Sequence, residues 1–343
     1  MEGVLMVVPD SAWPEGGNVT TAERIARWIH PQGWSVTVIP VADLDQRIRA
    51  GGISLLHAIH ARKSGVAVAR AAAARRIPFV VTFSGTDVAV DLADPATRDA
   101  LEAVMHAAAA ITVFHEDDRT RIVAAAPGMA PKVHVVWPGT ERLQGDADRD
   151  AWGLSADDLV FLLPAGVRAV KRPQFAVAPL EAVRERVPRL QLVIAGPAMD
   201  GPCVRDLEAS LVGRPWARWL GPVPHPHMGT LYRCADVVLN TSTAEGLSNA
   251  VMEAMALGRP LLVADNTGNR QALGREDPAG LIFSDVASFV AAARALAEDA
   301  ALRERLGQAA LARSRVFDPK REAAGYAEIY ARAREGGLEV MRA

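Results

Sequence analysis

Two glutamates, Glu245 and Glu253, lie eight positions apart in the stretch of the sequence that is richest in candidate functional groups. The residues that follow the first are Gly246, Leu247, Ser248 and Asn249. The stretch follows an apolar run and opens a helical pattern. If Ser248 caps that helix, Glu253 lies about five residues into it, roughly 7–8 Å along the axis. Free amides at a helix start favour a phosphate, and each carboxylate could hold a pair of hydroxyl groups. The pattern indicates a site for a sugar linked to a nucleoside diphosphate; the plainer interpretation is a capped helix with two surface glutamates.

Apolar runs and helical patterns alternate along the whole chain, and these elements must position the two glutamates. The runs are continuous, as in Val80-Val81-Thr82-Phe83, which is typical of parallel sheets covered on both faces. The predicted strands are 4–9, 35–40, 54–59, 79–83, 111–114, 133–137, 159–163, 190–195, 217–220, 237–240, 260–264 and 281–283. The predicted helices include 20–30, 64–76, 96–108, 174–187, 203–212, 226–234, 249–257, 286–298, 301–315 and 319–333.

A polar, turn-rich stretch at 138–150 separates two sets of these elements and predicts a linker. We expect an α/β protein with an N-terminal domain at 1–140 and a C-terminal domain at 141–318. A final helix at 319–343 could pack back on the N-terminal domain. Ligands of such sheets bind at the carboxyl ends of the strands, so a cleft between the domains is the expected site.

The composition excludes several classes of protein. The 343 residues suit two domains, and half of them are hydrophobic, which argues against disorder. The net charge of −2 argues against a nucleic-acid binder. Two cysteines cannot form a disulfide framework or a four-thiolate zinc site, and they fit a cytoplasmic setting. No apolar run is long enough for a membrane span, and no GxGxxG, P-loop, HExxH or GxSxG motif occurs.

The spacing of Glu245 and Glu253, with Ala-Met-Ala-Leu-Gly-Arg-Pro after it, resembles the retaining GT-B glycosyltransferases of family 4. That resemblance implies two Rossmann-like domains facing across a cleft. It also implies that Glu245 contacts the transferred sugar and Glu253 the ribose hydroxyls. In Ala165–Pro173, Arg168 and Lys171 match the cations that neutralise the donor diphosphate as negative charge grows on it. Their spacing differs from the usual one, so Lys171 rather than Arg172 is an inference.

Two further loops of the second half match the same family. They imply that backbone groups near Val223 read the base and that Gly196 allows a close approach to the nucleotide. No cofactor is expected, because the nucleotide-sugar is a substrate. No metal is expected either, since cations and helix amides would carry the phosphate charge. The strings Asp43-Leu44-Asp45 and Asp146-Ala147-Asp148 are interpreted as solvated turns.

The N-terminal half resembles the acceptor side of the family. Gly17 and Asn18 lie in a glycine-rich stretch at 16–24, where Gly17 would let backbone approach the donor or acceptor. This stretch is similar to the glycosyltransferase-1-domain-containing proteins and to the selenosugar synthases, which join a UDP-sugar to selenophosphate. The string at 60–64 is similar to the latter, and the string at 85–91 is similar to both. Three further residues are thereby assigned to the acceptor side, namely His60, Thr86 and Asp87.

Ser84 stands where relatives of family 4 have a histidine beside the sugar and the acceptor. Its hydroxyl is a poor base near pH 7, which leaves acceptor activation unassigned; Ser84 as a plain turn residue is an equal alternative. An acceptor that arrives as an anion needs no base but needs positive charge around it. We therefore predict a small anionic acceptor that contacts Arg62 or Lys63, with His60 beside them.

The sequence as a whole predicts a retaining transfer from a nucleotide-sugar, most simply a UDP-sugar, to a small acceptor. Two alternatives stay open. One is a selenosugar or thiosugar synthase of the same fold, which would use selenophosphate or a related anion. The other is a non-catalytic protein that binds a nucleotide-sugar.

Overall fold

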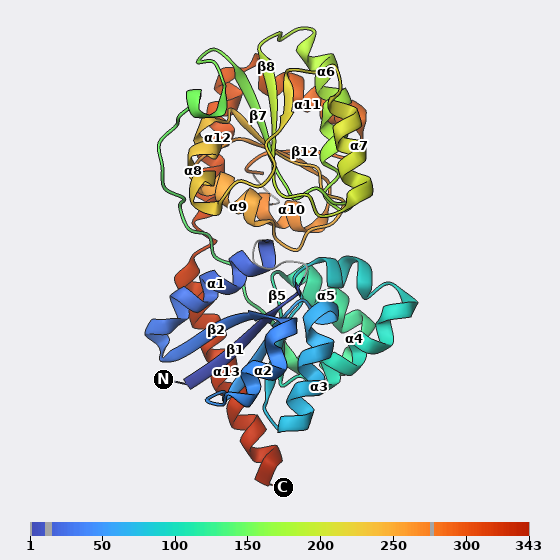
Figure 1. The fold of residues 1–343 in the computed structure, drawn as a ribbon, viewed down its shortest axis with the longest axis vertical. Helices are drawn as coiled ribbons and strands as arrows, with labels where there is room; N and C mark the ends of the chain where they lie inside the picture. Colours follow the sequence, from blue (N-terminus) through green and yellow to red (C-terminus); the bar gives the residue numbers. More distant parts are fainter. Residues whose placement is uncertain (1, 11–15, 275–277, 343) are drawn as a thin grey trace. The chain divides into compact units, whose positions relative to one another are not determined.

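The structure is a computed structural model that describes residues 2–10, 16–274 and 278–342. The chain forms two compact units (Figure 1). Unit 1 comprises Met1–Gly139 and Val316–Ala343, and unit 2 comprises Thr140–Arg315. Each unit has one six-stranded sheet of parallel strand pairs. The predicted α/β class with two parallel sheets is confirmed.

Unit 1 has the strand order β2-β1-β3-β4-β5-β6. Its strands are β1 (Glu2–Val8), β2 (Trp34–Pro40), β3 (Leu55–Ile59), β4 (Phe79–Thr82), β5 (Ala110–Val113) and β6 (Val133–Val135). Its helices are α1 (Gly17–Ile29), α2 (Leu44–Arg49), α3 (Val66–Arg75), α4 (Pro95–Ala107), α5 (Glu116–Ala125) and α13 (Pro319–Arg342). Shorter helical turns occupy His30–Gln32, Val41–Asp43, Ala61–Gly65, Asp87–Asp91 and Pro127–Lys132.

Both faces of this sheet are buried, because side chains of a strand point alternately to its two sides. Along β1, Leu5 and Val7 join a core with α2, α3, α4 and α5. Met6 and Val8 join a second core with α1 and α13. This arrangement explains why the strands of unit 1 appear in the sequence as unbroken apolar runs.

The last helix, α13, packs on unit 1 beside α1 (Figure 1). Arg24 of α1 pairs with Glu322 of α13 in the buried interior, with Nε 2.7 Å from Oε2. A second bond joins the Nη2 of Arg24 to Oε1 at 2.9 Å. His57 of β3 lies 2.7 Å from the Tyr330 hydroxyl through Nδ1 and 2.7 Å from Thr82 Oγ1 through Nε2. The chain end is thus held to the sheet by buried polar bonds as well as by apolar contact.

Unit 2 has the strand order β12-β11-β10-β7-β8-β9. Its strands are β7 (Leu159–Pro164), β8 (Leu190–Ala195), β9 (Ala217–Trp219), β10 (Val237–Asn240), β11 (Leu261–Ala264) and β12 (Leu281–Phe283). Its helices are α6 (Val177–Arg184), α7 (Gly201–Leu211), α8 (His225–Cys234), α9 (Asn249–Ala256), α10 (Thr267–Leu273), α11 (Val286–Glu298) and α12 (Ala300–Ser314), with helical turns at Asp150–Trp152 and Pro173–Ala176. Phe161 and Leu163 of β7 face one core, and Val160 and Leu162 are buried on the other side of the sheet.

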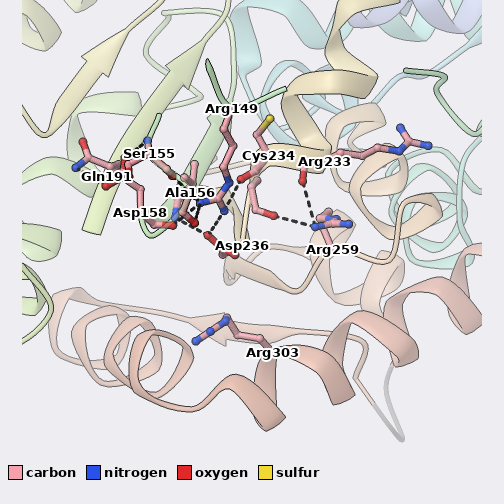
Figure 2. A network of polar contacts seen from close by, with 12 residues as sticks. Arg149, Ser155, Ala156, Asp158, Gln191, Arg233, Cys234, Asp236, Arg259 and Arg303 are labelled. Atoms are coloured by element: carbon pink, nitrogen blue, oxygen red, sulfur yellow. Dashed lines mark hydrogen bonds and ion pairs between the residues drawn. The ribbon is translucent and has the colours of Figure 1, made fainter. Parts of the chain in front are cut away.

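The segment between β6 and the turn at Asp150–Trp152 has no regular structure and is fastened to unit 2. The guanidinium of Arg149 donates to the carbonyls of Ser155, Ala156 and Asp158, and its Nη2 lies 3.0 Å from Asp236 Oδ2 (Figure 2). On α8, Gly229 lies so close to this segment that a Cβ there would be 1.9 Å from the Gln144 carbonyl oxygen. The second part of the linker predicted at 138–150 is therefore packed against unit 2.

Several elements of the structure were not predicted. Helices α2, α5 and α10 are not among the predicted helices, and no element was predicted where the helical turn at Asp87–Asp91 lies. His225 and His227 lie in the first turn of α8, whose predicted start was residue 226. Within the described residues, no helix is both long and apolar enough to cross a membrane.

Candidate functional site

Glu245 lies in the loop after β10 and is nearly buried, with 11% of its side chain exposed. The ammonium of Lys171 donates to its Oε1 at 2.5 Å, and the amide of Asn240 donates to the same oxygen at 3.2 Å. Burial by itself would raise the pKa of Glu245. The charge of Lys171 and hydrogen bonds from Lys171, Ser242 and Asn240 outweigh it, so the pKa is lowered. Glu245 is therefore an anion with one oxygen already used by the protein.

Two loops of unit 2 are bonded together so that Lys171 meets Glu245. The Thr241 hydroxyl donates to the Lys171 carbonyl at 2.7 Å, and the Thr243 amide donates to the Val170 carbonyl at 2.9 Å. One loop follows β7 and the other follows β10, and these strands are neighbours in the sheet. Because parallel strands end at the same edge, residues 70 positions apart in the sequence come together here.

Arg168 and Arg172 differ in their surroundings. The Nε of Arg168 is buried and has no hydrogen-bond partner among the residues that the structure describes. Arg172 has φ 44°, its Nε donates to the Thr241 carbonyl, and its guanidinium lies 5.1 Å from the centre of the Phe175 ring. The Arg172 side chain is thus held by a backbone carbonyl and an aromatic ring of the same unit.

An amide ladder that the sequence analysis missed stands behind Glu245. Asn269 is fully buried, and its Nδ2 donates to Asn240 Oδ1 at 3.1 Å and to the Ala264 carbonyl at 2.8 Å. Asn240 in turn donates to Glu245 and, at 3.4 Å, to Ser248 Oγ. This fixes the Asn240 side chain, which can then hold the carboxylate in one place. The signal in the sequence that could have revealed this ladder was Asn240 at the end of a predicted strand and Asn269 at the end of the string 266–269.

Gly268 brings the start of α10 against the Glu245 loop. A Cβ at Gly268 would lie 2.0 Å from the Gly246 carbonyl oxygen and 2.5 Å from that of Glu245. Real Cβ atoms do not come so close to oxygen, so only glycine fits here without a shift of the loop. Helix α10, which was not predicted, therefore supports the Glu245 loop, which was predicted to be part of the site.

Glu253 lies on α9, five residues after the N-cap position Ser248, with 10% of its side chain exposed. The Tyr232 hydroxyl donates to Oε2 at 2.9 Å, and His225 Nε2 lies 2.8 Å from Oε1. Burial raises the pKa of Tyr232 well above its usual value, and the Glu253 charge adds to this, so the hydroxyl keeps its proton. Neither Tyr232 nor His225 was assigned to Glu253 from the sequence.

The stretch between the two glutamates enters α9. Gly246, Leu247 and Ser248 are buried, and Asn249 begins the helix. Ser248 occupies the N-cap position, but its side chain makes no capping hydrogen bond, which corrects the expectation of a serine cap. Its hydroxyl accepts from Asn240 instead. The amides at this helix start therefore are not satisfied by the Ser248 side chain.

Two other predicted residues lie at the ends of neighbouring strands. Gly196 follows β8, and a Cβ there would be 2.2 Å from the Ala165 carbonyl oxygen. The close approach that the glycine permits in the structure is thus to the loop after β7. Val223, between β9 and α8, is partly exposed two residues before His225.

On unit 1, the loops after β3 and β4 converge on the Asp87 carboxylate, which is fully buried. Its Oδ2 accepts from the amides of Ala61 and Ser84, and its Oδ1 accepts from the amide of Gly85. Asp87 therefore holds the two loops together through hydrogen bonds to its carboxylate oxygens. In the structure, Asp87 positions the loops that carry Ser84 and His60.

His60 is buried with φ 80°, a strained conformation for a residue with a side chain. Its Nε2 lies 3.2 Å from Thr86 Oγ1, and its Nδ1 accepts from the Lys63 amide at 3.4 Å. Burial lowers the pKa of His60, and the charge of Asp87 only partly offsets this. The ring is therefore neutral near pH 7 and would have to release Thr86 before meeting a ligand.

The remaining acceptor-side residues lie at the surface of unit 1 or in its first helix. The exposed Arg62 pairs with Asp91, Nε to Oδ1, at 2.9 Å. Ser84 is partly buried and lies two residues after the end of β4. Gly17 and Asn18 form the first turn of α1 rather than the loop that was expected. In the described part of the chain, no three His, Cys, Asp or Glu side chains gather as a metal site would require.

Residues 158–299 match the family described as Glycosyl transferases group 1. Over 308 residues the chain is 26% identical to glycosyltransferase 1 domain-containing protein 1 of Xenopus tropicalis, a match that covers 84% of this chain and 86% of that relative. Over 232 residues it is 28% identical to the D-inositol 3-phosphate glycosyltransferase of Kribbella flavida, covering 63% of this chain and 54% of the relative.

The fold is similar to that of HepE from Anabaena, whose structure was determined in complex with UDP-glucose. The TM-score is 0.81 at 18% sequence identity, and the match covers 96% of this chain and 99% of that one. This likeness confirms the predicted GT-B fold, and the matching domain confirms the predicted class of enzyme. The chain has the GT-B fold, and its residues 158–299 match the family of glycosyl transferases group 1.

Proposed function

We propose that this protein transfers a glycosyl group from a nucleotide-sugar, most simply a UDP-sugar, to a small acceptor with retention of configuration. The observation that carries the proposal is the arrangement on unit 2. Glu245 is held as an anion by Lys171, Glu253 lies on the next helix, and the Nε of Arg168 is buried without a hydrogen-bond partner among the described residues. The binding of UDP-glucose by HepE, a protein of the same fold, supports the choice of donor.

In this proposal the residues of unit 2 bind and polarise the donor. Glu245 accepts hydrogen bonds from the sugar hydroxyls, and Glu253 accepts them from the ribose. Arg168 and Lys171 stabilise the diphosphate as the bond from the sugar C1 to phosphate oxygen breaks. Lys171, now paired with Glu245, would then be shared between that carboxylate and the phosphate.

The acceptor step needs no protein nucleophile. The acceptor atom forms its bond to C1 on the face from which the diphosphate leaves, and the leaving phosphate oxygen takes the acceptor proton. This route fits Ser84, whose hydroxyl is a poor base. It also fits cations and amides in place of a metal, so activity is expected to survive EDTA. A complete loss that added metal reverses would contradict this part of the proposal.

A second candidate is an anionic acceptor such as selenophosphate or thiophosphate. The exposed side chains of Arg62 and Lys63 favour it, whereas the ion pair of Arg62 with Asp91 and the burial of His60 weaken it. With such an acceptor, Arg62→Ala should raise the acceptor KM at least about tenfold, while Ser84→Ala should lose little activity. A neutral alcohol turned over equally well by Arg62→Ala would favour an ordinary sugar or polyol acceptor.

The deciding experiment is mass spectrometry of reactions with a panel of UDP- and GDP-sugars, with and without selenophosphate. Release of the free nucleoside diphosphate identifies the donor, and the added mass identifies the acceptor. Slow hydrolysis of a donor alone separates a catalyst from a protein that only binds. Binding without any turnover across the panel would support the non-catalytic alternative.

A further inference from the structure

Glu253 is a charged residue in an apolar helix. Its neighbours Val251, Met252, Ala254 and Met255 are all buried. Burying a carboxylate is unfavourable unless each oxygen has a partner. The two partners that α8 supplies to Glu253 differ sharply in their freedom to move.

Tyr232 is the fixed partner. It is fully buried, and its hydroxyl donates to Glu253 Oε2 at 2.9 Å while lying 3.2 Å from the Ala250 carbonyl oxygen. A ring enclosed on all sides cannot turn away without opening a cavity. Tyr232 therefore sets the rotation of the carboxylate and leaves the other oxygen, Oε1, to face a different group.

His225 is the movable partner. It stands seven residues before Tyr232, two turns earlier on the same face of α8, which is why both reach Glu253. Its side chain is 48% exposed, and its Nε2 lies 2.8 Å from Oε1. An exposed imidazole can exchange such a bond for water at little cost. Oε1 is thus the oxygen that a ligand can gain.

We propose that Tyr232 is the positioning residue that sets Glu253 for a ribose diol, and that His225 is a replaceable partner that the diol displaces. A carboxylate has about four lone-pair sites, so it can accept from Tyr232 and from two vicinal hydroxyl groups together. The inference rests on the proposed function, in which Glu253 binds the ribose of the donor.

The test compares ligands that differ only in the diol. Calorimetry would measure the Kd of UDP, GDP and ADP and of their 2′,3′-dideoxy counterparts, and the tightest pair would be used. Tyr232→Phe should weaken the ribonucleotide about tenfold and the dideoxy ligand no more than about twofold, because one hydrogen bond to a charged group is lost. His225→Ala should leave the ribonucleotide Kd unchanged or make it a few-fold tighter.

Two controls keep the test decisive. Tyr330→Phe also removes a buried hydroxyl, but on unit 1, and should leave both Kd values unchanged. If Tyr232→Phe does not fold because Glu253 loses its donor, the variant is made in a Glu253→Gln background, which carries no buried charge. There Tyr232→Phe should have no further effect, as expected for a residue that acts through Glu253.

Equal weakening of the ribonucleotide and dideoxy ligands by Tyr232→Phe would overturn the positioning role. A threefold or greater weakening by His225→Ala would overturn the displacement of His225. Failure of all three diphosphates to bind the unaltered protein would instead contradict the proposed function itself.

Discussion

Replacing Gly268 by alanine tests whether the start of α10 sets the Glu245 loop. The added Cβ would lie 2.0 Å from the Gly246 carbonyl oxygen and 2.5 Å from that of Glu245. An ordinary contact between these atoms is more than 3 Å, so the backbone must move by about 1 Å. A misplacement of about 1 Å can cost about 100-fold in rate, and overpacking of this kind destabilises by about 1–3 kcal/mol. We therefore expect Gly268→Ala to lower donor turnover by about two orders of magnitude and to lower the Tm.

The assay is release of the nucleoside diphosphate from the donor that the panel identifies, together with thermal unfolding of the same samples. Gly201→Ala is the matched control, since Gly201 begins α7 in the same unit and a Cβ there would meet only the Arg205 guanidinium, at 3.6 Å. That control should keep its activity and its Tm. If Gly268→Ala is indistinguishable from Gly201→Ala in both assays, α10 does not position Glu245.

Three other predictions follow from buried charges. Arg168→Ala should weaken the binding of a nucleoside diphosphate by about 1.5–3 kcal/mol and that of the nucleoside much less, as calorimetry can compare; an equal loss for both would remove Arg168 from the diphosphate. Glu322→Gln should lower the free energy of unfolding by about 3–5 kcal/mol in urea, because it removes the negative charge from the buried ion pair with Arg24; a loss below 1 kcal/mol would contradict this. Burial raises the pKa of Asp118 from 3.8 to about 7, so the folded state binds the extra proton. The stability from this group is complete below about pH 4 and is lost as the pH rises through 7, and Asp118→Asn should flatten that part of the stability curve. An unchanged slope between pH 4 and 7 would refute it.

The alternation of strands and helices could be predicted because each strand is buried on both faces. Val4 to Val8 read as one apolar run, since alternate side chains enter two different cores. The strand 190–195 and the helix 286–298 have the predicted bounds. The short helices α2 and α10 were missed because hydrophobic periodicity needs more than two turns to stand out.

The two glutamates and the two cations could be found because their types and spacing lie within single loops of the sequence. Their partners could not, because these lie on other elements. Asn269 is linked to Glu245 through Asn240, which bonds to both. Asn269 lies 24 residues after Glu245 in the sequence, and the two residues follow different parallel strands. Such a ladder exists only when the sheet brings the ends of β10 and β11 together.

Tertiary structure also decided which of several similar residues does what. Arg172 and Lys171 are adjacent cations, but a left-handed backbone at Arg172 turns one toward Thr241 and Phe175 and leaves the other on Glu245. In the same way, the sequence assigned Asp87 to the acceptor side, and in the structure its oxygens accept hydrogen bonds from backbone amides. The sequence by itself determined which chemical groups are available and on which kind of element each lies. Only the packing of distant elements decided which groups are already paired, because a charge that is buried must take its partners from whatever the fold places beside it.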